Sequence, residues 1–143
     1  MRIVRLGLLA VIAVGVLMLA ACDRVTPRED AALPPPIPDG VALVVEETTG
    51  PVSLRPGQTF AVALSSNFDW QVEALPDSLE LLGTETAPTT AAQRDGGATG
   101  GATWFVFHLK AASVGDGELV LVEARGWEPA AIQTRRIAVR VEP

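Results

Sequence analysis

The reactive side chains limit what this chain can do, because it contains one cysteine, Cys22, and one histidine, His108. A single cysteine excludes an intrachain disulfide, and one cysteine with one histidine supplies too few ligands for a typical zinc site. His108 stands in the apolar run W-F-V-F-H-L, and no G-x-S-x-G nucleophile sequence accompanies it. We therefore predict no catalytic residue, no metal and no cofactor, and expect a protein that is not an enzyme.

Two other stretches have the composition of binding loops. The first is the run G-G-A-T-G-G, whose glycines allow close backbone approach to a partner. Its glycines are Gly96, Gly97, Gly100 and Gly101. This run lacks the Lys-Ser/Thr pair of a phosphate-binding loop. The second stretch is R-G-W, in which Trp127 stands near Arg125, a combination typical of interface anchors.

Each stretch also has a simpler interpretation. The glycine run could serve only as a flexible linker, and Trp127 could fold over the end of the domain. The two stretches flank runs of strand-forming residues, however, and loops held by rigid strands commonly carry function. We therefore treat residues 95–129 as a candidate binding edge.

The residues around this edge are typical of strands rather than helices. Apolar and polar residues alternate over residues 58–65, where Phe60, Val62 and Leu64 share one face. A similar alternation covers residues 103–110, and Trp70 is expected in the core. Further strand-like runs cover residues 41–46, 52–57, 70–74, 79–82, 118–124 and 133–142. About seven short strands predict an all-β, immunoglobulin-like antiparallel β-sandwich with no disulfide over residues 41–143.

Residues 83–102 do not fit the strand pattern. They contain no large apolar side chain, and loops of this length in a compact domain are usually functional or disordered. We expect the Ala/Thr-rich half to be disordered and the glycine half to form the binding loop. The sequence Gly115-Asp116-Gly117 predicts a turn.

The N-terminus is typical of an export signal. Arg2 and Arg5 precede an apolar run that ends in L-A-A-C at Cys22. This predicts a signal peptide over residues 1–21, and L-A-A-C resembles a bacterial lipobox, which implies lipidation of Cys22. The localisation implied is the bacterial cell envelope, lipid-anchored and facing the periplasm. Asp23 resembles an inner-membrane retention signal.

The segment after the cysteine and the overall charge suggest a spacer and exclude one class of partner. Residues 22–40 contain five prolines, and such a tether extends about 3.1 Å per residue, or on the order of 50 Å. The net charge of −6 repels phosphate backbones, so we expect no nucleic-acid partner. The membrane contact would run through the lipid on Cys22.

Five pieces in order resemble the chagasin-type inhibitors of papain-like cysteine peptidases. They are L-R-P-G-Q-T-F-A-V-A-L-S-S-N (residues 54–67), Trp70, the glycine run, the paired W-F-V-F run, and R-G-W-E-P with the final I-A-V-R-V strand. No single piece is specific, but the ordered set is more so. The resemblance covers residues 41–143 and implies an immunoglobulin-like fold, which agrees with the strand pattern.

The resemblance also implies a site and a partner. Family members present three loops at one end and insert them into the peptidase cleft without reacting. By position these loops correspond to three sets of residues: Asn67 and Phe68; Gly96, Gly97, Gly100 and Gly101; and Arg125, Gly126 and Trp127. The implied partner is a papain-like cysteine peptidase, bound by a monomeric inhibitor tethered to a membrane.

The chain departs from the family pattern in all three loops. The family's first loop reads N-P-T-T-G followed by an aromatic residue, whereas Asn67 is followed directly by Phe68. Gly126 replaces the proline of the family's R-P-W, and the glycine run has one additional residue of spacing. The leading hypothesis is reversible inhibition by loop insertion, and the alternative is a non-inhibitory envelope protein-binding module on the same fold.

Overall fold

The computed structural model describes residues 30–46 and 50–143. The predicted signal peptide and Cys22 lie outside these residues. In the described part of the chain, no helix has both the length and the apolar character needed to cross a membrane.

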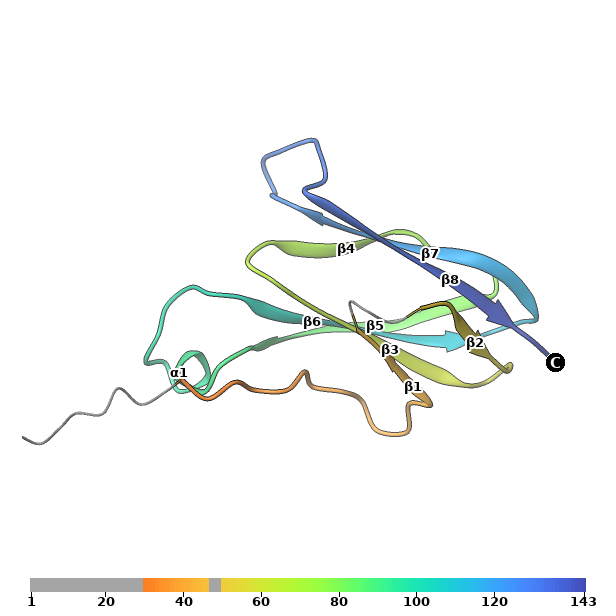
Figure 1. Ribbon diagram of the computed structural model, residues 1–143, viewed down its shortest axis with the longest axis horizontal. Helices are drawn as coiled ribbons and strands as arrows, with labels where there is room; N and C mark the ends of the chain where they lie inside the picture. The colour runs from red at the N-terminus through yellow and green to blue at the C-terminus, as the bar shows by residue number, and fades with distance from the viewer. Residues whose placement is uncertain (1–29, 47–49) are drawn as a thin grey trace, which may run out of the picture.

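Two four-stranded sheets form a sandwich (Figure 1). The strands are β1 (Leu43–Val45), β2 (Val52–Leu54), β3 (Thr59–Ser66), β4 (Asp69–Ala74), β5 (Leu79–Pro88), β6 (Thr103–Ala111), β7 (Gly115–Ala124) and β8 (Gln133–Val141). The first sheet has the order β1-β3-β6-β5, and the second has the order β2-β8-β7-β4. The fold is therefore the predicted all-β immunoglobulin-like sandwich, with eight strands instead of about seven.

The pairing is antiparallel except at one edge of each sheet. β1 pairs in parallel with β3, and β2 pairs in parallel with β8. These two short strands follow each other along the chain, separated by residues 46–51, yet they belong to opposite sheets. The N-terminal part of the domain thus changes sheets at this point and closes one side of the sandwich.

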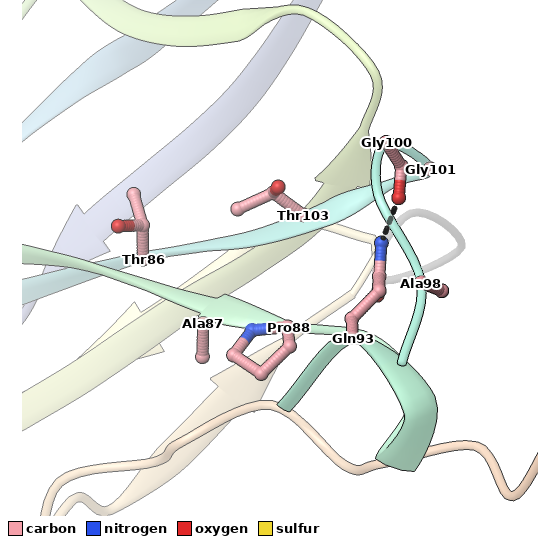
Figure 2. Close-up of a pocket in the computed structure, with 8 residues that line it drawn as sticks. All are labelled: Thr86, Ala87, Pro88, Gln93, Ala98, Gly100, Gly101 and Thr103. Carbon is pink, nitrogen blue, oxygen red and sulfur yellow. Dashed lines mark hydrogen bonds between the residues drawn. The ribbon is translucent and has the colours of Figure 1, made fainter. Parts of the chain in front are cut away.

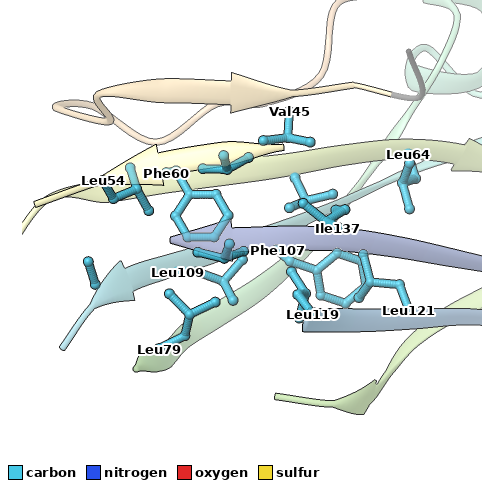
Figure 3. Packing of buried hydrophobic residues seen from close by; sticks show 14 of the residues in the cluster. Val45, Leu54, Phe60, Leu64, Leu79, Phe107, Leu109, Leu119, Leu121 and Ile137 are labelled. Atoms are coloured by element: carbon cyan, nitrogen blue, oxygen red, sulfur yellow. The ribbon is translucent and has the colours of Figure 1, made fainter. Parts of the chain in front are cut away.

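The apolar side chains of the alternating strands fill the space between the two sheets. Phe60, Val62 and Leu64 from β3 are at most 1% exposed, and they meet Phe107 and Leu109 from β6. Figure 3 shows the labelled phenylalanines and leucines of β3 and β6 packed beside leucines of β7 and Ile137 of β8. Trp70 joins the same cluster, as predicted. Burial of such large apolar side chains is the main stabilising contribution in a domain without a disulfide.

The proline-rich segment packs on the domain where the structure describes it. Ile37, Val41 and Val44 cover a second apolar cluster on the outer face of the first sheet, formed by Ala61, Ala63 and Val106. Farther along, the main chain of Ala32 pairs with that of Thr90, and the indole N–H of Trp104 donates to the carbonyl oxygen of Leu33 at 2.8 Å. Residues 30–40 are therefore packed against the sandwich, which differs from a freely extended spacer.

The stretch that lacked large apolar residues is also ordered. β5 continues through residue 88 as the edge strand beside β6. Most of its side chains are exposed, and for this reason the hydrophobic pattern did not predict it. A short helix, α1 (Ala91–Arg94), follows. The predicted disorder of the Ala/Thr-rich half is thus wrong, and Gly115-Asp116-Gly117, predicted as a turn, begins β7.

Candidate functional site

The strand register brings three connections to one end of the sandwich. Ser66 at the end of β3 lies opposite Thr103 at the start of β6, which in turn lies opposite Pro88 at the end of β5. In the second sheet, Asp69 at the start of β4 lies opposite Ala124 at the end of β7. The first loop (residues 67–68), the second loop (residues 89–102) and the third loop (residues 125–132) therefore share what we call the loop end, away from the C-terminus (Figure 1).

The first loop is short, and buried hydrogen bonds through the Ser66 hydroxyl hold it. Only Asn67 and Phe68 separate β3 from β4. The backbone N–H of Phe68 donates to the hydroxyl oxygen of Ser66 at 2.8 Å, and that hydroxyl donates to the carboxylate of Glu123. Ser66 and Glu123 are both 8% exposed and belong to opposite sheets. This buried contact fixes the first loop to the strand that leads into the third loop.

The third loop presents a tryptophan on a turn that is closed by contacts between Arg125 and Glu128. The guanidinium of Arg125 lies over the ring of Phe68, 4.7 Å from the ring centroid, and forms an ion pair with Glu128 at 2.9 Å. The N–H of Glu128 also donates to the carbonyl oxygen of Arg125 at 3.0 Å. Trp127 stands between these two residues in sequence and is 77% exposed. The charge of Arg125 is thus used to join the first and third loops, while the indole is left free to contact a partner.

The second loop is a capped helical turn followed by the glycines. The hydroxyl of Thr90 accepts the N–H of Gln93, and the Gln93 side chain accepts the N–H of Thr90, which completes a capping box around α1. Among the predicted glycines, Gly96, Gly100 and Gly101 have positive φ angles, which explains why glycine stands there. All four predicted glycines are exposed. The run is therefore a structured loop and not a flexible linker.

One ion pair at the loop end shifts two pKa values. Hydrogen bonding to the side chain of Arg94, together with its charge, lowers the pKa of Asp95 below its usual value. The same contact raises the pKa of Arg94. The pair lies on the surface at 2.9 Å, so its contribution to stability is small. Both groups therefore stay charged at physiological pH, and this ion pair adds no pH dependence to the loop end in that range.

An open recess of about 350 Å³ lies between the second loop and the ends of β5 and β6 (Figure 2). It is lined by Thr86, Ala87, Pro88, Gln93, Ala98, Gly100, Gly101 and Thr103. None of these side chains is an acid, a base or an activated nucleophile. The recess suits van der Waals contact and hydrogen bonding to a partner rather than catalysis.

The single histidine of the chain lies outside the loop end. His108 lies in the middle of β6, opposite Ala61 and Gly83, and its Nε2 is buried without a hydrogen-bond partner. The imidazole is half-buried. Within residues 30–46 and 50–143, no cluster of His, Cys, Asp or Glu side chains could hold a metal ion.

Three contributors to the site were not predicted from the sequence. They are the Ser66–Glu123 contact, the amide of Gln93 and the segment at Asp30–Leu33. The first and third depend on contacts between distant parts of the chain. The second had a local signal, because Thr90-Ala-Ala-Gln93 fits the S/T-x-x-E/Q pattern of a capping box.

Comparison with known proteins identifies the class of fold and then the family. A model of the family described as Chagasin family peptidase inhibitor I42 matches residues 53–141. This match spans more than half of the chain and includes all three loops. The chain belongs to the chagasin family of peptidase inhibitors and not to a family of enzymes. No curated protein sequence matches it.

Two solved structures share the fold. The crystal structure of the cysteine protease inhibitor EhICP2 from Entamoeba histolytica has a TM-score of 0.55 at 18% identity, and the match covers 72% of this chain and 100% of that chain. The solution structure of Amebosin has a TM-score of 0.58 at 21% identity, covering 70% of this chain and 97% of that one. At these identities the likeness concerns the fold alone.

Proposed function

We propose that this protein is a membrane-tethered, reversible inhibitor of papain-like cysteine peptidases that inserts its loop end into the active-site cleft. The observation that carries the proposal is the gathering of all three loops at one end with Trp127 projecting, 77% exposed. An exposed tryptophan framed by a fixed arginine is typical of residues that dominate interface energies. Family membership supports a peptidase as the partner.

The first loop contributes little surface, so the other two must supply most of the contact. Asn67 is exposed, whereas Phe68 is half-buried beneath Arg125. The second and third loops comprise residues 89–102 and 125–132, and both are framed by hydrogen bonds. A loop that is already ordered loses less entropy on binding. The short first loop is therefore compatible with inhibition by the two longer ones.

The tether is proposed to begin at a lipidated Cys22 in the bacterial envelope, with Asp23 favouring the inner membrane. Asp30 lies eight positions after Cys22, and at up to 3.6 Å per position the two Cα atoms are at most roughly 29 Å apart. Asp30 contacts the second loop through the N–H of Ala92, at 2.9 Å. A lipid on Cys22 would thus keep the loop end close to the membrane, and the target peptidase would be met there.

Steady-state inhibition of a papain-like peptidase tests the proposal. The purified domain should inhibit competitively and reversibly at submicromolar concentrations, without being cleaved. Absence of inhibition at tens of micromolar against several such peptidases would contradict it. For the tether, mass spectrometry of protein expressed in bacteria should find acyl chains on Cys22 and none in a Cys22→Ser variant.

A non-inhibitory protein-binding module of the envelope is the second candidate, and the two-residue first loop favours it. The two functions differ in what the loop end captures from envelope extract. Recovery of a non-peptidase partner through Trp127, with no inhibition of any papain-like peptidase, would support the second.

A further inference from the structure

The side chain of Gln93 makes more contacts to the second loop than any role in capping α1 requires. Its Oε1 accepts the N–H groups of Thr89 at 3.0 Å and Thr90 at 3.2 Å. Its Nε2 donates to the carbonyl oxygens of Gly100 at 2.7 Å and Ala102 at 3.1 Å. One amide therefore joins the strand-side start of the loop to its return into β6, across the glycine run. Figure 2 shows its contact with Gly100.

The backbone at the far side of the loop is shaped to accept this amide. A Cβ atom at Gly101 would lie 2.6 Å from the Gln93 Nε2, and Gly101 has a φ of +95°. A side chain at this position would displace the amide and strain the backbone. Thr89 adds a parallel contact, because its hydroxyl donates to the carbonyl oxygen of Ala102 at 2.9 Å.

Hydrogen bonds of α1 continue into the glycine run. The N–H groups of Gly97 and Ala98 both donate to the carbonyl oxygen of Ala92, at 2.8 and 3.2 Å. The run is thus attached to the helix on one side and to Gln93 on the other. Without Gln93, the return of the loop would be held mainly by the hydroxyl of Thr89.

We propose that Gln93 is the positioning residue that fixes the second loop in its binding conformation, so that the glycine run docks on the peptidase already ordered. This inference rests on the proposed inhibitory function and deepens it. Glycines oppose the ordering of the loop, because they lose more backbone entropy than other residues. The hydrogen bonds of Gln93 supply that ordering before the partner binds. Gln93 acts through the loop, and its own side chain need not touch the partner.

Two substitutions separate the parts of this role. Gln93→Ala removes all four backbone contacts. Gln93→Glu keeps an oxygen for the N–H groups of Thr89 and Thr90 but sets a carboxylate oxygen against the two carbonyl oxygens. Gln71→Ala is the matched control, because Gln71 is an exposed glutamine on β4 that lies outside the loop end.

The binding experiment measures inhibition constants and association rates against a papain-like peptidase. We expect Gln93→Ala to weaken inhibition about tenfold, mainly through slower association, because the loop must then be ordered during docking. Gln93→Glu should be as weak at pH 7 and should recover part of its affinity near pH 4, where a carboxyl group becomes protonated and can donate. Equal inhibition by Gln93→Ala and the wild type would overturn the proposal.

Hydrogen exchange tests the same inference without a peptidase. The amides of Gly97 and Ala98 should exchange at least about tenfold faster in Gln93→Ala, while core amides of β3 and β6 stay protected. Unchanged exchange at these two amides would refute the positioning role. If the wild-type domain inhibited nothing while exchange rose in the variant, the proposed function would fail and the ordering role of Gln93 would stand.

Discussion

Replacement of Trp127 by alanine removes the largest exposed apolar group at the loop end. A tryptophan carries on the order of 250 Å² of surface, and Trp127 is 77% exposed. A partner that covers most of this would remove about 150 Å² from water, equivalent to about 4 kcal/mol at roughly 25 cal/mol per Å². Because buried area converts incompletely to affinity, we expect a loss of about 2–3 kcal/mol, or roughly 30- to 150-fold.

The assay is the inhibition constant of Trp127→Ala against a papain-like peptidase, with thermal unfolding measured in parallel. The free energy of unfolding should change by less than about 0.5 kcal/mol, because the side chain makes little contact with the folded domain. Val114→Ala is the control, since Val114 is 56% exposed between β6 and β7 at the opposite end. An affinity loss below threefold for Trp127→Ala would show that the partner does not cover the indole, and a large loss of stability would place the side chain in the core.

Two further substitutions test how the loops are held. Ser66→Ala leaves the buried carboxylate of Glu123 without its hydroxyl donor. Denaturant titration should therefore show that the free energy of unfolding falls by about 1–3 kcal/mol. An unchanged midpoint would mean that water replaces the hydroxyl. Trp104→Phe removes the hydrogen bond to the carbonyl oxygen of Leu33, so the free energy of unfolding should fall by about 1 kcal/mol. The backbone near Asp30–Leu33 should also become more accessible to proteases. Equal protease resistance would show that other contacts hold the segment.

The fold could be predicted because its signal is local. Alternation at Phe60, Val62 and Leu64 reports directly on which face of β3 is buried. The edge strand β5 could not be predicted beyond its start, because an edge strand with an exposed face needs no apolar pattern. The small residues Ala61 and Ala63 on the outer face were an unused signal, since they leave room for the segment that carries Ile37.

The candidate site was predicted only in part, for a related reason. Composition pointed to the glycine run and to Trp127, and the structure brings both to one end of the sandwich. What orders them is not visible in composition. The contact of Arg125 with Phe68 joins residues far apart in sequence, and the Gln93 amide reaches across the loop to Gly100. Side-chain contacts of this kind follow from the fold and could not be assigned before it.

The proposed inhibition requires that the loop end occupy the active-site cleft of a cysteine peptidase. Binding should therefore be compared between a papain-like peptidase with an empty cleft and the same enzyme whose cleft is filled by a covalently attached peptidyl inhibitor. We predict submicromolar binding to the empty enzyme and at least a hundredfold weaker binding to the filled one. Equal binding to both forms would contradict insertion into the cleft.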